Sequence, residues 1–154
     1  MTKDSNDRSL DALVTSRGDD FALRGARCGT CDALFYPLRK ACERCGSTTM
    51  HEEPLPRTGT LWSWTSQNFP PPAPPYFRGE DKATYAPYWV GYVDLGEVLV
   101  LSRVRGEGGL TVGDPMKLEL EPLPGADGSV PALIPVFVRF SPSSPSAASV
   151  RAVR

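Results

Sequence analysis

The residues with the clearest chemical potential are the four cysteines, which all lie within eighteen residues of one another. Cys28 and Cys31 form one Cys-x₂-Cys pair, and Cys42 and Cys45 form a second pair after ten intervening residues. A two-residue gap lets one tight turn direct two sulfurs at the same ion, and two such turns complete a tetrahedral site. Four thiolates fill the zinc coordination shell and leave no position for water. The spacing therefore predicts one structural Zn²⁺ and no catalysis at the metal.

Two other uses of the four thiols remain open from the residues alone. Iron binds the same ligand set in a rubredoxin-like electron carrier, and two disulfides are compatible with four cysteines in an oxidising compartment. The segment Met1–Asp7 is polar and lacks the apolar stretch of a signal peptide. No apolar run in the sequence is long enough to span a bilayer. We therefore expect a cytoplasmic protein, in which reduced thiols favour metal binding.

The residues around the cysteines predict a small zinc ribbon over residues 21–56. Each Cys-x₂-Cys turn needs a residue that accepts positive φ directly after its second cysteine. Gly46 supplies one such residue and Asp32 is tolerated as the other. Phe21–Arg24 is predicted to be a short strand leading into the first pair. Between residues 24 and 45, five basic side chains outnumber two acidic ones and are expected to offset the negative charge of a zinc tetrathiolate. They are Arg24, Arg27, Arg39, Lys40 and Arg44.

Residues 1–20 form a polar and charged N-terminal segment in which three large aliphatic side chains stand out. Leu10, Leu13 and Val14 have the spacing of one or two amphipathic helical turns, with a frayed tail as the alternative. The other end of the chain, residues 142–154, is rich in Ser, Pro and Ala and is expected to be disordered.

The region between the ribbon and the tail has the pattern of a small all-β domain. Sixteen prolines and fourteen glycines favour short strands joined by turns. The predicted strands are Thr60–Ser66, Pro87–Leu95, Glu97–Val104, Met116–Leu123 and Leu133–Phe140, with a hairpin at Gly96. Closing five short strands into a barrel removes their free edges. The predicted fold class is therefore mainly β, a rubredoxin-like zinc ribbon followed by a five-stranded OB-fold barrel over residues 57–141; an SH3-like barrel is the alternative.

The side chains available for catalysis are few. His51 is the only histidine and lies in a charged linker beside Glu52 and Glu53, where a histidine is usually just solvated. No glycine-rich phosphate loop precedes a helix, since Gly106–Gly109 joins two predicted strands. Because every cysteine is assigned to the metal, no nucleophile with an activating base remains. We expect no enzymatic activity from the chain alone.

Five aromatic residues of the predicted barrel raise the possibility of nucleic-acid binding, since OB barrels stack bases on exposed rings. They are Trp62, Trp64, Tyr88, Trp89 and Tyr92. Residues 58–140, however, hold six basic side chains against nine acidic ones, whereas a single-strand binder needs a positive groove. The sequence thus favours a role of these rings in the barrel core and in one apolar docking surface. A single-stranded nucleic-acid module stays the alternative.

Several stretches of the chain resemble a known family. RCGTCDALFYPLRKACERCGS, GTLWSWTSQN, YWVGYVDLGEVLVLSRV, LTVGDPMKL and FVRFSP, spanning residues 20–142, resemble the zinc-ribbon/OB-fold family associated with acyl-CoA enzymes, domain of unknown function 35. Asp32 departs from the glycine that the family often has there. The resemblance implies a non-catalytic subunit of a hetero-oligomer with a thiolase-superfamily enzyme, such as an acyl-CoA thiolase, a steroid side-chain aldolase or a related acyltransferase. Such a subunit would support its partner's fold and help shape the CoA or acyl channel.

A proline-rich segment is the predicted docking element for such a partner. Phe69–Phe77 contains five prolines, which exclude a helix or a central strand and pre-order an extended backbone. With the ribbon face, the segment from Phe69 to Trp89 is expected to form the interface, unless its rings cap the open end of the barrel instead. The candidate contacts with partner or CoA are Phe69, Tyr76, Phe77, Arg78, Lys82 and Trp89.

Overall fold

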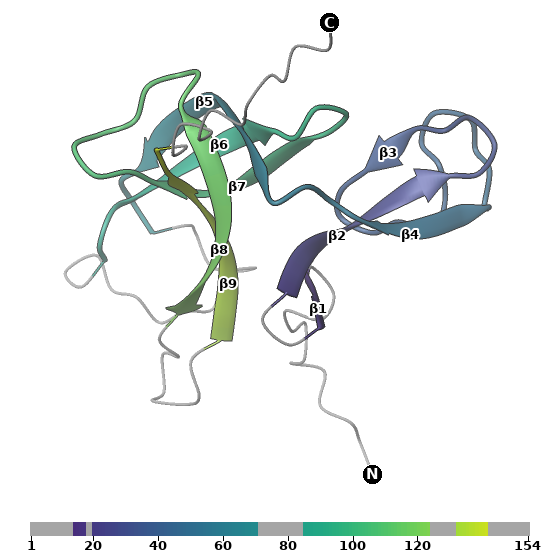
Figure 1. Ribbon diagram of the computed structural model, residues 1–154, viewed down its shortest axis with the longest axis horizontal. Coiled ribbons are helices and arrows are strands. Elements are labelled where there is room, and N and C mark those ends of the chain that lie inside the picture. The colour runs from purple at the N-terminus through teal and green to yellow at the C-terminus, as the bar shows by residue number, and fades with distance from the viewer. Residues whose placement is uncertain (1–13, 18–19, 71–84, 124–131, 142–154) are drawn as a thin grey trace, which may run out of the picture.

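A computed structural model describes residues 14–17, 20–70, 85–123 and 132–141 of the chain. Every regular element in these ranges is a β-strand, and the strands form a ribbon sheet beside a closed barrel (Figure 1). The ribbon sheet consists of β1 (Val14–Arg17), β2 (Asp20–Cys28), β3 (Leu34–Phe35) and β4 (Met50–Pro54). The barrel consists of β5 (Thr58–Gln67), β6 (Tyr88–Asp94), β7 (Leu99–Arg105), β8 (Pro115–Leu123) and β9 (Ala132–Arg139). The described residues contain no helix long and apolar enough to cross a membrane.

The five barrel strands have the order β5-β6-β7-β9-β8, and β8 pairs back onto β5 to close the ring. Strands β7 and β9 are parallel, and the other neighbours are antiparallel. This closed five-stranded barrel is the OB fold that the sequence predicted. All five predicted strands are confirmed, and their ends differ from the prediction by at most two residues.

The predicted hairpin at Gly96 is also confirmed, and it joins β6 to β7. The Leu95 N–H donates to the Val98 carbonyl at 3.0 Å, and the Gly96 N–H donates to Asp94 Oδ1 at 2.8 Å. Gly96 has φ +99°, a conformation that side chains other than glycine's rarely adopt. Figure 1 shows this hairpin pointing from the barrel toward the ribbon sheet.

The barrel core is filled mainly by aliphatic side chains rather than by the tryptophans. Its fully buried members are Leu61, Val93, Val100, Met116, Leu118 and Phe137. Trp62, Trp64 and Tyr92 are 56%, 38% and 41% exposed, so of the two places predicted for the aromatic rings, the core and an apolar docking surface, these three rings do not occupy the core. A β-bulge contributes to this outcome, because Leu61 pairs with Val93 and Ser63 with Tyr92, which leaves Trp62 as an extra residue on β5.

The ribbon sheet and the barrel share one hydrophobic cluster. Leu23 on β2 and Leu55, just after β4, are buried in the same cluster as Leu61 and Leu95 of the barrel. The Leu55 N–H donates to the Leu23 carbonyl at 2.9 Å, which ties the two ends of the ribbon together at this point. The predicted boundary between residues 56 and 57 therefore falls beside a shared core, and the division into two domains stays a prediction.

At the N-terminus, Val14 begins a strand instead of belonging to a helical turn. β1 pairs antiparallel with β2, with Val14 opposite Leu23 and Arg17 opposite Asp20. Pairing with β2, the next strand along the chain, thus outweighs the weak helical spacing at Val14. Leu10 and Leu13, the other two residues of that spacing, lie outside the described residues. The predicted strand Phe21–Arg24 is confirmed as part of β2. The tail 142–154 also lies outside the described residues.

Candidate metal centre

Each cysteine pair sits in a tight turn whose backbone hydrogen bonds fix the direction of the sulfurs. In the first turn the Asp32 N–H donates to the Cys28 carbonyl at 3.0 Å, and in the second the Gly46 N–H donates to the Cys42 carbonyl at 2.9 Å. Asp32 has φ +60° and Gly46 has φ +75°. The sequence prediction of positive φ directly after each second cysteine is therefore confirmed at both turns.

The two turns bring the four sulfurs of Cys28, Cys31, Cys42 and Cys45 into one cluster. All four ligand atoms lie within 4.8 Å of one another. The Sγ atoms of Cys28 and Cys45 are 3.6 Å apart, as are those of Cys31 and Cys42. A Zn–S bond of about 2.3 Å in a tetrahedron requires sulfurs about 3.8 Å apart, whereas a disulfide bond is about 2.05 Å long. The separations thus fit four ligands of one metal ion and are too long for disulfides, in agreement with four free cysteines.

The electrostatics of the thiol cluster also favour the binding of a cation. The backbone N–H groups of Cys31 and Thr30 donate toward Cys28 Sγ and lower the pKa of this thiol to about 6. At Cys45 the backbone N–H of Ser47 lowers the pKa, but desolvation and the three neighbouring thiols outweigh it and raise the pKa to about 12. One thiol ionises readily and another resists ionisation, because several negative sulfurs this close repel one another. A dication removes that conflict, since metal ligation deprotonates coordinating thiols.

The donor set identifies the metal centre as a structural zinc site. Four thiolates at this spacing form the closed Cys₄ set of a zinc ribbon, and binding energy at such a site becomes folding energy. What the ion supplies here is a cross-link between the β2–β3 turn and the loop before β4, through Cys28 and Cys31 on one side and Cys42 and Cys45 on the other.

Three of the five basic side chains counted around the cysteines pair with carboxylates, so their charge does not act on the thiolates alone; they are Arg24, Arg27 and Arg39. Arg24 forms two hydrogen bonds with Glu52, at 2.8 and 2.7 Å. Arg27 binds Glu53 and Glu97, and its guanidinium lowers the pKa of both carboxyls. The sequence count of charges was correct, but it ignored the acidic residues of β4 and the β6–β7 hairpin, which the fold brings against Arg24 and Arg27.

The Arg27 side chain connects the metal centre to the barrel. Arg27 lies on β2 directly before Cys28, and its Nη1 donates to the Asp32 carbonyl of the first cysteine turn at 3.0 Å. Its Nη2 donates to Glu97 at the tip of the β6–β7 hairpin at 2.8 Å. One guanidinium therefore bridges the zinc turn, β4 and the barrel.

The residues predicted to contact a partner are only partly described. Phe69 is 72% exposed at the end of β5, and Trp89 is half-buried and packs on Trp64 with ring centroids 5.3 Å apart. Trp89 lies at the start of β6, and its contact with a partner stays a prediction. The other four candidates, Tyr76, Phe77, Arg78 and Lys82, lie outside the described residues. His51 is exposed on β4, and its proposed lack of a catalytic role stays a prediction.

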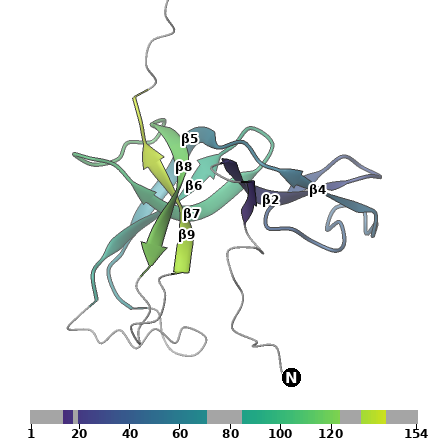
Figure 2. The same ribbon diagram turned by 60° about the horizontal axis from the view of Figure 1, so that its bottom comes forward.

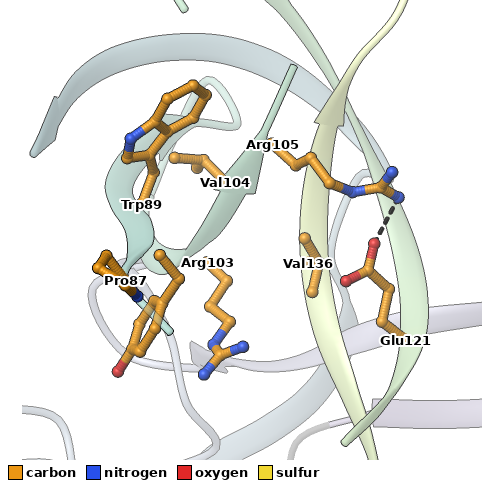
Figure 3. Close-up of a pocket in the computed structure, with 8 residues that line it drawn as sticks. Pro87, Trp89, Arg103, Val104, Arg105, Glu121 and Val136 are labelled. Atoms are coloured by element: carbon orange, nitrogen blue, oxygen red, sulfur yellow. Dashed lines mark ion pairs between the residues drawn. The ribbon is translucent and has the colours of Figure 1, made fainter. Parts of the chain in front are cut away.

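Sequence reasoning missed a pocket of about 350 Å³ beside the start of β6 (Figure 3). Its apolar lining comes from β6, β7, β9 and the residue before β6, namely Trp89, Val104, Val136 and Pro87. Two arginines at the pocket already have partners: Arg105 forms an ion pair with Glu121, and Arg103 stacks 3.7 Å from the centroid of the Tyr88 ring. No motif indicates this site, because its lining residues are spread over four barrel segments.

A zinc ribbon joined to an OB barrel is the class of protein that the fold and the metal centre define. Residues 15–51 match a family model described as the rubredoxin-like zinc ribbon domain of ChsH2, and residues 52–121 match one described as its C-terminal OB-fold domain. Together the two matches cover most of the chain. The chain belongs to this ChsH2 family of zinc-ribbon/OB-fold proteins.

Two solved structures are similar to this chain. A chain titled "Ltp2-ChsH2(DUF35) aldolase" has 25% sequence identity and a TM-score of 0.54, and the match covers 77% of this chain and 84% of that one. A protein of unknown function from the DUF35 family of Sulfolobus solfataricus has 15% identity and a TM-score of 0.47, with 76% and 75% of the two chains covered. No curated protein matches the sequence.

Proposed function

We propose that this chain is a non-catalytic, zinc-stabilised accessory subunit of a thiolase-superfamily enzyme that acts on acyl-CoA thioesters. The observation that carries the proposal is the likeness to the solved chain named Ltp2-ChsH2(DUF35) aldolase. That likeness extends over both the ribbon and the barrel, since it covers 77% of this chain. The partner's reaction would be that of a thiolase, an aldolase or an acyltransferase.

The inventory of reactive groups supports a role without chemistry. The sequence holds four cysteines, and all four form the closed metal centre. The single histidine, His51, is exposed on β4. With neither an available thiol nucleophile nor an open metal position, the chemical steps fall to the partner. Reduced thiols that hold a metal also fit a cytoplasmic location, where thiols stay reduced.

The accessory role would consist of supporting the partner's fold and shaping its CoA or acyl channel. The proline-rich segment from Phe69 to Trp89 is suited to docking, because prolines reduce the conformational entropy that binding must overcome. Arg78 and Lys82 in that segment are the candidates for an acidic partner surface or a CoA phosphate, although Glu80 and Asp81 offset their charge.

Co-expression with an aldolase subunit of the Ltp2 type from the same organism tests the proposal. We expect a stable, zinc-loaded complex that cleaves or forms the carbon–carbon bond of an acyl-CoA substrate, and a partner that is insoluble or poorly active without this chain. The isolated chain should show no turnover. Failure of the purified chain to bind the subunit, or full activity of the partner alone, would contradict the proposal.

A single-stranded nucleic-acid module is the second candidate, because Trp62 and Tyr92 are exposed rings on an OB barrel. The excess of acidic over basic side chains between residues 58 and 140 speaks against it. Titration with oligothymidylate while following tryptophan fluorescence separates the two candidates, since only a nucleic-acid module binds with an affinity that falls steeply with salt.

A further inference from the structure

The outer side of β5, β6 and β7 carries a contiguous group of exposed apolar side chains. We call Trp62, Tyr92, Leu99 and Leu101 the aromatic face. Tyr92 is paired with Leu101 across β6 and β7, and the bulged β5 places Trp62 beside Tyr92. Leu101 is 58% and Leu99 42% exposed. Their neighbours in the strands, Val93 and Val100, point into the core, so the alternation of the strands is intact and the apolar outer side is not a packing accident.

The aromatic face is preorganised. The rings of Trp62 and Tyr92 meet edge to face, with centroids 6.1 Å apart and planes at 85°, which is a favourable geometry for an aromatic pair. Bulges of the kind that turns Trp62 outward commonly re-aim a side chain. Aromatic side chains with few rotatable bonds lose little conformational entropy on binding, so a fixed Trp–Tyr pair is the kind of anchor that dominates protein interfaces.

The size of the aromatic face restricts what can cover it. With about 150–250 Å² for a whole aromatic side chain, the four exposed portions amount to roughly 400 Å², at the level where exposed apolar patches on monomers are often functional. A symmetric contact of two copies through this face alone would bury about half of the roughly 800 Å² per partner that stable interfaces need. The occupant must therefore extend beyond the face.

The ribbon lies where a partner that covers the aromatic face could extend its contact and bury the additional surface area. The β6–β7 hairpin, which ends the aromatic face at Leu99, contacts the ribbon through the 2.8 Å bond between Arg27 and Glu97. Figures 1 and 2 show the loop between β6 and β7 on the side of the barrel that faces the ribbon sheet. Charges along the face are balanced, with Asp94 at the hairpin end and Arg103 at the other. A strand of nucleic acid would find little positive charge there, whereas a protein with an apolar surface would find no unpaired charge cluster to desolvate.

We propose that the aromatic face, continued onto the ribbon across the Arg27–Glu97 junction, is the surface on which the aldolase-type partner subunit docks. The proposal rests on the proposed function and specifies where the partner binds. It places the centre of the interface on the outer side of the barrel sheet.

The test compares variants in complexes with a co-expressed Ltp2-type aldolase subunit of the same organism. Trp62→Ser combined with Leu101→Ser removes two members of the aromatic face, and Leu101→Ser alone removes one. Leu133→Ser removes an exposed leucine from β9, a strand that carries no member of the face, and serves as the matched control for Leu101→Ser. We expect the double variant to bind the subunit at least about tenfold more weakly, as loss of a central anchor does, Leu101→Ser to bind more weakly than Leu133→Ser, and the control to bind like the wild type.

Zinc content and melting temperature, measured on all variants, separate loss of contact from loss of fold. A photo-crosslinking residue at position 101 should capture the aldolase subunit, and one at position 133 should not, which tests the placement without relying on a weakened variant. If the wild-type chain does not bind the subunit at all, the proposed function fails. If the wild type and the Trp62/Leu101 variant bind equally well, only the placement of the interface fails. If the wild type forms a homodimer and the Trp62/Leu101 variant does not, the face binds a second copy and the proposal is overturned. Binding of oligothymidylate by the wild type but not by this variant would overturn it as well.

Discussion

Replacing Cys42 by Ser should release the zinc, and the damage should extend into the barrel. The ion cross-links the two cysteine turns, and structural zinc in such ribbons contributes about 10–16 kcal/mol at neutral pH. Three thiolates hold the metal far less well, so we expect residues 24–50 to lose their order. Leu23 and Leu55 border that segment and are buried in the barrel's own core cluster.

The cost to the barrel follows from these two leucines. Fully burying a leucine is worth about 1.5–3 kcal/mol, so releasing both removes about 3–6 kcal/mol from a domain whose total stability is about 5–15 kcal/mol. At about 4–8 °C per kcal/mol for a domain of this size, the melting temperature should fall by at least about 12 °C while the barrel remains folded in the cold. Wild-type protein treated with a chelator should behave in the same way.

Three measurements on Cys42→Ser and on wild type check this reasoning: elemental analysis for zinc, the melting temperature by circular dichroism, and amide hydrogen exchange by segment. We expect one zinc per wild-type chain, none in the variant, and loss of protection that is largest in the ribbon. Stoichiometric iron in the wild type would refute the metal assignment. A variant that loses its zinc but keeps the wild-type melting temperature would refute the coupling of ribbon and barrel through the shared core.

Three further predictions concern activity, packing and docking. The isolated chain should show no thiolase, hydratase or acyltransferase turnover in assays with CoA thioesters, and His51→Ala should leave the rate of the assembled enzyme within about threefold, because a dispensable side chain contributes far less than a general acid or base. Gly25→Ala should lower the melting temperature of the zinc-loaded protein, because the added Cβ would lie 2.5 Å from Leu55 Cδ2. An unchanged melting temperature would contradict close packing of Gly25 against Leu55. Replacing Tyr76 and Phe77 together by Ala should give a folded, zinc-loaded protein that binds the aldolase subunit less well, whereas lower thermal stability with normal binding would assign these rings to the barrel end.

The parts of the fold that the sequence predicted correctly depend on local signals. Two-residue cysteine spacing, Gly46 after the fourth ligand and alternating residues such as those of Met116–Leu123 each act within a few residues, and the structure agrees with all three. Local patterns fix turns and strand faces because side chains alternate strictly along a strand. The barrel followed because five short strands without a helix have few ways to cover their edges.

The errors arose where a distant partner or a single inserted residue decides the outcome. Period-two alternation in β5 correctly separated two faces, but it could not say which face is inward, and the bulge at Trp62 shifts the register between them. Val14 joins a strand because β2 lies beside it, a pairing that no helical spacing reveals. Arg27 was counted as one of several cations, although its partner Glu97 is seventy residues away.

The zinc centre and the aromatic face are linked by physical contacts. Zinc holds Cys28 in place, and the preceding residue, Arg27, extends from the same strand to Glu97 on the β6–β7 hairpin. The strands that leave this hairpin carry Tyr92 and Leu99 of the aromatic face. If partner binding uses the aromatic face as proposed, a metal without an open coordination position would affect it, because the metal would stabilise the sheet that presents the proposed docking residues. On this reasoning Glu97→Gln should leave the zinc bound and the barrel folded, yet weaken binding of the aldolase subunit. An unchanged affinity for the subunit would show that the Arg27–Glu97 contact does not connect the metal centre to partner binding.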